Sequence, residues 1–249
     1  MTDYKIASDL ISSSLSLSSA PVAIAFCNEL PEGIPEFDGL VAAGCQFWEL
    51  AGRKVFATSA KDHRLCSIGI HTHNIAGAPE TQETELITTL KVMMTLDYVR
   101  DDEVPKIPAN KNTSAYVIYG PLDSFPCTAD VVVVFSNSRQ GLVISEAAER
   151  VDGATPLAMG RPACAAIPQV INSGNATLSL GCCGARAYID ALTDMTSLWV
   201  FPIDKLSKYI EQIAILGSAN ETLNTFHQRR KLDVLSGEEP SVASSLERM

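Results

Sequence analysis

A run of five consecutive apolar residues constrains the fold of this chain more than any other feature of its sequence. The run is Val131-Val132-Val133-Val134-Phe135, within a predicted strand over residues 130–135. Successive side chains of a strand point to opposite faces of the sheet, so this strand is apolar on both faces. Such a strand is typical of the centre of a sheet that is covered on both sides. The run therefore predicts an α/β fold.

Helices and strands alternate along the rest of the chain. Apolar residues that recur every three to four positions are typical of helices, and short apolar runs bounded by turn residues are typical of strands. The predicted helices cover residues 4–18, 43–51, 80–99, 139–150, 163–172 and 203–231. The further predicted strands cover residues 21–27, 54–59, 114–119, 176–180 and 197–202.

The segments between these elements set the expected domain organisation. Residues 28–40 and 101–113 carry prolines and are predicted loops, and residues 60–79 are predicted to be irregular. We expect a mixed sheet flanked by helices in a single α/β domain over residues 1–235. A flexible polar tail is expected over residues 236–249.

The order of the elements suggests two similar halves, at about residues 20–122 and 128–205. Each half begins with a strand of similar pattern, Pro21–Phe26 or Asp130–Phe135, followed by a cysteine at the start of a short helix. A second strand, a second cysteine and a third strand follow in each half, and the first half also carries the helix over residues 80–99. Few residues are identical, so chance similarity is the alternative. A true repeat predicts two halves related by a pseudo-two-fold axis and packed as one body.

The charge balance excludes several classes of partner. The 249 residues include 19 Lys and Arg against 29 Asp and Glu, which gives a formal net charge of −10. A protein that binds nucleic acid or an anionic membrane needs a basic face, so neither partner is expected. No apolar run is long enough to span a membrane, and the start of the chain does not resemble a secretory signal. We therefore expect a cytoplasmic protein.

The seven cysteines are the main indication of function. An odd number of cysteines without an export signal argues against a disulfide framework. A free cysteine most often behaves as a small buried apolar residue. That interpretation suits Cys27, in an apolar strand, and Cys127, in a loop beside Pro126. The remaining cysteines are Cys45, Cys66, Cys164, Cys182 and Cys183.

Position suggests that four of these cysteines form a metal centre. Cys45 and Cys164 lie at predicted helix N-termini, where the helix dipole and free N–H groups favour the thiolate. Cys66 and Cys182 follow predicted strands, next to glycines that allow close backbone approach and offer N–H groups to a sulfide or anion. The glycines predicted to border the cofactor are Gly69, Gly181 and Gly184.

Four thiolates brought together by the predicted two-fold axis would repel one another unless a soft cation or cluster neutralised them. We therefore expect an iron–sulfur cluster held by these four cysteines. A [4Fe–4S] cluster is favoured over [2Fe–2S], and zinc is the alternative metal. The competing interpretation is that the four are buried apolar cysteines near loops. Cys183 is a spare thiol, a substitute ligand or a redox neighbour.

Histidines and arginines near the cysteines are candidate catalytic groups. His63 lies three residues before Cys66 and could act as a proton donor. His71-Thr72-His73, together with a cysteine, could instead bind zinc or iron. Arg186 could bind a carboxylate or phosphate in a bidentate manner, or form an ordinary surface ion pair. Arg161 offers a second arginine, shortly before Cys164.

The same segments resemble an uncharacterised prokaryotic family, the domain-of-unknown-function family numbered 169. The likeness extends over about residues 5–215, and the resemblance implies that the family's recurrent cysteines are Cys45, Cys66, Cys164 and Cys182. Where family members often have Gly-Cys-x-Gly-Asn-Arg, this chain has Ala185 before Arg186. The matching stretches are Ala43 to Trp48 with Ala51-Gly52, His63 to Cys66 with Gly69, Tyr119 to Leu122, Ala129 to Val132, Ala163 to Ala165 and Leu178 to Arg186.

Three functions follow from these residues. The first is an iron–sulfur protein in electron transfer or redox catalysis on a small molecule, and therefore a candidate redox enzyme. The second is a metal-free enzyme with Cys66 or Cys182 as nucleophile and His63 as base. The third is a zinc-stabilised module that binds a small molecule. The expected partners are a small-molecule substrate or a redox protein, and a second copy of the chain, for which Val131–Phe135 and the helix over residues 80–99 supply apolar surface.

Overall fold

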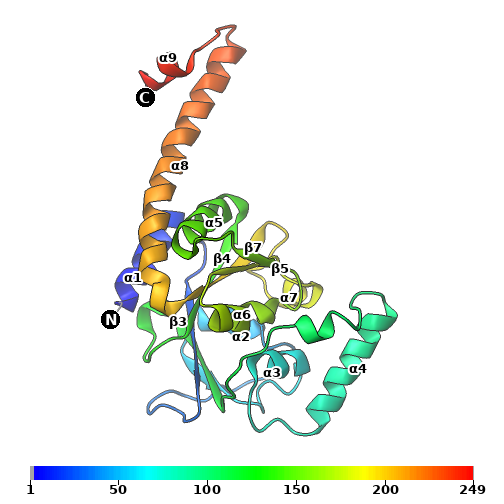
Figure 1. Cartoon of the computed structure of the whole chain (residues 1–249). Coiled ribbons are helices and arrows are strands. Elements are labelled where there is room, and N and C mark those ends of the chain that lie inside the picture. Colours follow the sequence, from blue (N-terminus) through cyan, green and yellow to red (C-terminus); the bar gives the residue numbers. More distant parts are fainter. Residues whose placement is uncertain (1–2, 249) are drawn as a thin grey trace.

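A computed structural model describes residues 3–248 and contains a seven-stranded sheet with helices on both faces (Figure 1). The strand order is β2-β3-β1-β4-β7-β6-β5. Neighbouring strands are antiparallel except for the parallel pair β5 and β6. The predicted α/β fold with a mixed sheet is therefore confirmed. The strands are β1 (Val22–Cys27), β2 (Phe56–Thr58), β3 (Tyr116–Pro121), β4 (Val131–Asn137), β5 (Leu157–Met159), β6 (Thr177–Ser179) and β7 (Thr196–Pro202).

Most helices lie where the apolar periodicity predicted them. The helices of the described residues are α1 (Tyr4–Leu15), α2 (Gln46–Ala51), α3 (Ser67–His73), α4 (Thr81–Thr95), α5 (Ser138–Asp152), α6 (Ala166–Ser173), α7 (Cys183–Tyr188), α8 (Leu206–Leu235) and α9 (Val242–Leu246). Of these, α3, α7 and α9 were not predicted. Short 3₁₀ turns are η1 (Val104–Lys106), η2 (Leu122–Ser124), η3 (Ala163–Ala165) and η4 (Ile203–Lys205). Helix α3 lies in the segment that was predicted to be irregular, which corrects that prediction.

The central strand β4 divides the apolar core into two layers. Val131, Val133 and Phe135 pack into one core, together with side chains of α2, α6 and α7. Val132 and Val134 pack into the other, together with α1, α5 and α8. Both faces of the strand are thus buried, as the apolar run predicted. The first layer also carries α3 and the candidate functional residues.

The two predicted halves occupy opposite sides of the sheet centre. Their strands follow the orders β2-β3-β1 and β6-β7-β4, and β1 pairs with β4 in an antiparallel manner. The halves also differ, because α4 belongs only to the first, whereas α5 and β5 belong only to the second. Strand order alone does not establish that equivalent residues superpose, so the pseudo-repeat stays a prediction.

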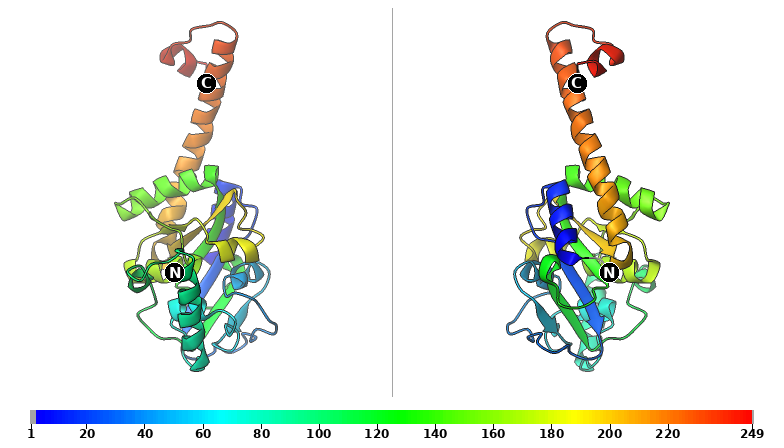
Figure 2. Two further views of the ribbon diagram at one scale, coloured as in Figure 1. Left: turned by 90° about the vertical axis from the view of Figure 1, so that its right-hand side faces the viewer. Right: turned by 90° about the vertical axis from the view of Figure 1, so that its left-hand side faces the viewer.

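Two segments extend from this body (Figures 1 and 2). Helix α4 lies at its side, and the outer part of α8 projects from it with α9 at the end. The expected tail thus contains a short helix, because the Ser241 side chain caps α9 and Arg248 pairs with Asp233 of α8 at 2.7 Å. Within residues 3–248, no helix has both the length and the apolar character that crossing a membrane requires.

Candidate functional site

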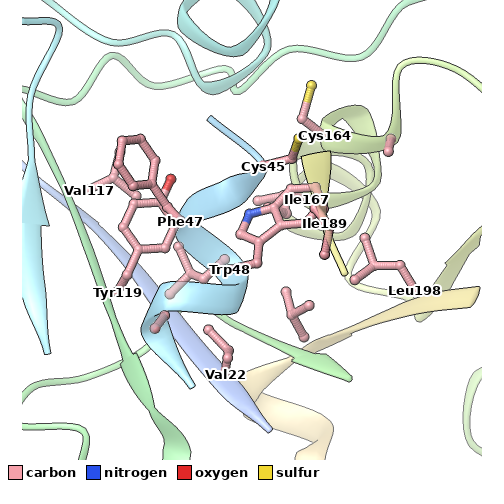
Figure 3. Packing of buried hydrophobic residues seen from close by; sticks show 14 of the residues in the cluster. Val22, Cys45, Phe47, Trp48, Val117, Tyr119, Cys164, Ile167, Ile189 and Leu198 are labelled. Atoms are coloured by element: carbon pink, nitrogen blue, oxygen red, sulfur yellow. The ribbon is translucent and has the colours of Figure 1, made fainter. Parts of the chain in front are cut away.

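The four predicted ligand cysteines lie at the starts of four short helical segments. Cys45, Cys66 and Cys182 are the residues that immediately precede α2, α3 and α7, and Cys164 lies in η3, directly before α6. All four line one cavity of about 630 Å³. Figure 3 shows that Cys45 and Cys164 direct their sulfur atoms away from the packed ring of Trp48. The structure therefore brings together the four cysteines that the sequence singled out.

The cavity has two walls of different construction. The inner wall is the side that carries the four cysteines, on helices packed against the sheet. The outer wall consists of residues from α4, from the segment over residues 98–108 and from residues 159–162. Cys183 also lines the cavity and is exposed, whereas Cys27 and Cys127 lie elsewhere.

Aromatic packing fixes the inner wall. The side chains of Phe47 and Trp48 in α2 are fully buried, and the Phe47 ring lies 5.5 Å from that of Tyr119 in β3. A Trp or Phe buried in this way contributes on the order of 3–5 kcal/mol to stability. These two residues hold α2 against the sheet, and so they fix the position of Cys45.

Two glycines leave room for His63 and Cys66. A Cβ atom at Gly44 would lie 2.8 Å from His63 Nδ1, and one at Gly69 would lie 3.0 Å from Cys66 Sγ. Each of these Cβ positions is within 4 Å of both His63 Nδ1 and Cys66 Sγ. The backbone thus approaches the two side chains closely at both glycines. Gly44 was not predicted, although its place directly before Cys45 is a sequence signal for such an approach.

The two other glycines predicted to border the cofactor differ from Gly69. Gly181 has a φ of +80°, and a Cβ there would lie 2.7 Å from Leu192 Cδ2, so this turn requires glycine. Gly184 lines the cavity from α7, and a Cβ there would meet only the Tyr188 ring, at 3.7 Å. Both glycines flank the Cys182 and Cys183 pair.

Hydrogen bonds define the protonation of His63. Thr58 Oγ1 donates its single proton to the Val117 carbonyl at 3.3 Å, and it lies 3.1 Å from His63 Nε2. His63 Nε2 therefore carries the ring proton and donates it to Thr58, which leaves Nδ1 with a free lone pair. Burial, and His73 nearby, lower the pKa of His63 well below its usual value. The ring is thus neutral at pH 7 and presents an acceptor next to Cys66.

The cysteines influence one another electrostatically. Burial raises the pKa of the Cys45 thiol to about 12, and the nearby Cys66 and Cys182 contribute to that rise. Burial likewise raises the pKa of Cys164 well above its usual value, with smaller contributions from other cysteines of the set. Thr72 Oγ1 donates a hydrogen bond to Cys164 Sγ at 3.4 Å. Without a bound cation, Cys45 and Cys164 are therefore neutral thiols at pH 7.

Several buried polar atoms lie near the thiols without a hydrogen-bond partner among the described residues. They include His63 Nδ1, Trp48 Nε1 and both ring nitrogens of His73. The Tyr119 hydroxyl is also buried without a well-formed hydrogen bond, and burial together with Cys164 raises its pKa well above its usual value. Buried polar atoms in proteins are usually paired, so these unpaired atoms mark places where ordered water or a ligand contributes, although none of the four side chains lines the cavity.

The chemistry of this set fits a soft metal or a metal–sulfur cluster. Four thiols, a close backbone at two glycines and unpaired polar atoms supply the ligands and the hydrogen-bonding surroundings of such a group. As the side chains stand, no three His, Cys, Asp or Glu residues within 3–248 form a group that could hold a single metal ion.

The rival histidine set is not assembled. His71 is exposed on α3, whereas His73 is buried, with its ring 6.0 Å from that of His63. The His-x-His pair therefore does not present both rings to one metal, because its two residues lie in opposite environments. Burial lowers the pKa of His73 to about 4, so it is neutral at pH 7.

The two arginines have different environments. Arg186 does not line the cysteine cavity, and it donates hydrogen bonds to the carbonyls of Leu180, Thr193 and Thr196. These bonds tie the segment after β6 to the loop before β7, a structural role that the sequence did not predict. Arg161, by contrast, lines the outer wall of the cavity.

The fold and the cavity define an α/β protein with four cysteines converging on one cavity. The chain belongs to the DUF169 family, described as uncharacterised ArCR, whose sequence profile matches residues 10–212. No curated protein and no solved structure matches the chain. The matched region contains the whole sheet and all five cysteines that line the cavity, and it ends within α8.

Proposed function

We propose that this chain is a cytoplasmic iron–sulfur protein that carries out electron transfer or redox catalysis on a small molecule. The observation that supports it is that four cysteines, from four separate helix starts, line one cavity. Soft thiolate ligands favour iron–sulfur clusters, with zinc as the alternative. Cys45, Cys66, Cys164 and Cys182 are the proposed ligands.

A bound cluster would supply one-electron chemistry at the inner wall. The chain's own residues prepare the place for it. Burial of Cys45 and Cys164 excludes water, and Thr72 Oγ1 offers Cys164 Sγ a hydrogen bond that stabilises the thiolate. His63 Nδ1 is a neutral acceptor beside Cys66, because the Gly44 and Gly69 backbones hold the two side chains close together.

The metal-free nucleophile is the second proposal, and it fits less well. A nucleophilic cysteine acts as the thiolate, which needs a lowered pKa. The candidate nucleophiles are Cys66 and Cys182, and a single nucleophile does not explain why they share one cavity with the buried thiols of Cys45 and Cys164. A soft cation removes this difficulty, because it stabilises all four thiolates at once.

The test is metal analysis of protein expressed with iron and purified without oxygen. We expect iron and acid-labile sulfide in equal amounts, near four per chain for a [4Fe–4S] cluster, with absorbance near 400 nm. Serine replacement of Cys45, Cys66, Cys164 or Cys182 should remove this absorbance. The matched controls are Cys27→Ser and Cys127→Ser, which lie outside the cavity and should keep it.

The alternatives give different results in the same experiment. Stoichiometric zinc without colour would support a structural or Lewis-acid site instead. Protein without metal, together with rapid inactivation by a thiol alkylator, would support the cysteine nucleophile. Loss of metal in the control variants as well would mean that unfolding, and not ligand removal, explains the results.

A further inference from the structure

The outer wall of the cysteine cavity is mostly apolar and carries three charged side chains. Leu90, Met93, Val99, Ile107 and Met159 line it, and the charged residues are Glu103, Lys106 and Arg161. The volume of about 630 Å³ lies within the range of roughly 300–1,000 Å³ typical of small-molecule sites. An apolar pocket with a few charged groups orients a ligand through those groups. The chemistry of the three charges therefore identifies the kind of ligand.

Arg161 is held in place but is not saturated. Its guanidinium carbon lies 4.5 Å from the centre of the Tyr98 ring, and its Nη2 lies 3.4 Å from Glu103 Oε2. Its other N–H groups donate to no group among residues 3–248. A stacked guanidinium with free donors presents a planar fork that matches a carboxylate or phosphate. Arg186 differs, because three backbone carbonyls already accept its hydrogen bonds.

The charges of the outer wall favour an anion. Glu103 offsets one positive charge, but Lys106 adds a second. Lys106 pairs at 2.9 Å with Asp102, which does not line the cavity, and both members of that pair are largely exposed. Exposed pairs of this kind are weak, so Lys106 can turn toward a ligand at small cost. The cavity wall is thus locally positive in a chain of net charge −10.

Arg161 is also close to the thiols along the chain. It precedes Cys164 by three residues, and both line the same cavity. An anionic group bound at Arg161 leaves the apolar part of the ligand against Met93 and Met159 and within the space that the cysteines face. The ligand's body would then lie beside the place where the proposed function puts its redox chemistry.

We propose that the cavity binds a small molecule with an apolar body and one anionic group, and that Arg161, assisted by Lys106, binds that group. The inference names the substrate class for the proposed function. Only the redox reaction of the ligand rests on that function, because binding can be measured without a metal. A carboxylate and a phosphate monoester share the required chemistry, and the experiment distinguishes them.

The test is calorimetric and ligand-observed NMR titration of the full chain, both as purified and after metal removal. The probes are benzoate and phenyl phosphate, with benzamide as the neutral isostere of benzoate and benzylamine as the cation. We expect the better anion to bind at least about tenfold more tightly than benzamide, since charge-assisted hydrogen bonds contribute on the order of 1.5–3 kcal/mol. The tighter of the two anions identifies the anionic group.

Variants locate the binding group. Arg161→Gln should weaken anion binding about tenfold and leave benzamide binding unchanged, and Lys106→Gln should weaken it about two- to threefold, as expected for an assisting point charge. The matched control is Arg139→Gln, because Arg139 is an exposed arginine of α5 with only a 3.9 Å pair to Glu221. It should bind the anions like the natural chain.

Three results would overturn the inference: equal binding of benzamide and the anions, an unchanged affinity in Arg161→Gln, or no binding of either anion at millimolar concentration. Iron and sulfide are measured on the same samples of the natural chain and of Arg161→Gln that are used for the titrations. Anion binding without any cluster would contradict the proposed function and support this inference. A cluster without anion binding would support the proposed function and contradict this inference.

Discussion

The two walls of the cavity are built on different amounts of buried surface. The inner wall stands on α2, whose Phe47 and Trp48 are completely buried against the sheet. The outer wall depends on α4, in which Gln82 is the one buried residue of the fifteen that the helix contains. Local stability follows the number of buried apolar contacts. The inner wall should therefore open only when the whole domain unfolds, whereas the outer wall should open at a much lower free-energy cost.

This difference assigns separate tasks to the walls. A metal centre needs ligands held within a fraction of an ångström by packed neighbours, and the inner wall has such neighbours. A small molecule must enter and leave, and a weakly anchored wall permits that. Predictions about the two walls should therefore differ in size, and the following substitutions are paired to measure the difference.

Removal of a large side chain should separate the walls most clearly. Trp48→Ala removes a fully buried ring of the inner wall, and we expect it to lower the free energy of unfolding by about 3–5 kcal/mol. Met93→Ala in α4 removes a partly exposed side chain of the outer wall and should cost less than about 1 kcal/mol. Urea denaturation followed by circular dichroism measures both values.

Similar losses in the two variants would contradict the comparison. In that case α4 would be as firmly anchored as α2, and access to the cavity would need another route. An unchanged slope of the denaturation curve is the control, because it shows that both variants unfold from states of similar compactness.

The inner wall could be predicted only in part from the sequence. The apolar run in β4 predicted the sheet centre, and the local pattern correctly placed Cys45 and Cys164 at helix starts. The sequence predicted the convergence of the four cysteines only through a two-fold axis that stays a prediction, because the contacts that bring them together join segments far apart in the chain. Helix α3 was missed because its sequence, Ser67 to His73, is short and contains a glycine and β-branched residues that lower helix propensity.

For the outer wall, the helix was predicted but its position beside the cavity was not. The periodicity of residues 80–99 predicted a helix, and α4 is present, but the same apolar residues were not recognised as one side of a cavity. Apolar spacing reports the shape of an element and not which neighbour covers it. The role of Arg186 was missed for a similar reason, because tertiary structure brings to it the carbonyls of Leu180 after β6, of Thr193 before β7 and of Thr196 in β7.

Glycine substitutions test how closely the backbone packs on each wall. In Gly44→Ala the new Cβ would lie 2.8 Å from His63 Nδ1, so the ring must move. We expect a loss of about 1–3 kcal/mol in the free energy of unfolding, as for other overpacked core sites. Gly160→Ala is the outer-wall control, because a Cβ there has no atom within 4 Å and the backbone is unstrained. It should be neutral or slightly stabilising.

The iron content of Gly44→Ala and Gly160→Ala gives a second comparison of the two walls. Gly44→Ala should also reduce the iron bound per chain, because displaced His63 lies next to Cys66, whereas Gly160→Ala should keep it. A Gly44→Ala variant that changes neither stability nor iron content would show that the inner wall adapts as easily as the outer wall.

The pH dependence of the free energy of unfolding tests whether the interior behind the inner wall excludes water. The folded-state pKa of His73 is about 4, below the unfolded value of about 6.5. Between these values the unfolded chain binds more protons than the folded one, so the free energy of unfolding falls as the pH decreases through this window. Between pH 7 and pH 5, the free energy of unfolding should fall by about 1–2 kcal/mol less in His73→Phe than in the natural chain. His63 shifts in the same direction and should account for acid sensitivity that remains.

Denaturation at pH 7 and at pH 5, for the natural chain and His73→Phe, gives this difference directly. Phenylalanine keeps a ring against Phe26, which lies 5.5 Å from that of His73, and introduces no unpaired nitrogen. Equal pH dependence in both proteins would mean that His73 is accessible to protons in the folded state.

The smallest effect concerns the ion pair of the outer wall. Glu103→Gln removes the carboxylate that lies 3.4 Å from Arg161, in a pair whose side chains are 41% and 35% exposed. Glutamine keeps an oxygen for the backbone N–H of Arg100, which now donates to Glu103 at 3.0 Å. The free energy of unfolding should change little, because exposed ion pairs contribute little to stability. The affinity for benzoate or phenyl phosphate should rise severalfold, because Arg161 loses its competing anion while its stacking on Tyr98 is kept. A fall in affinity would show instead that Glu103 orients Arg161, and that the outer wall is more firmly organised than its exposure indicates.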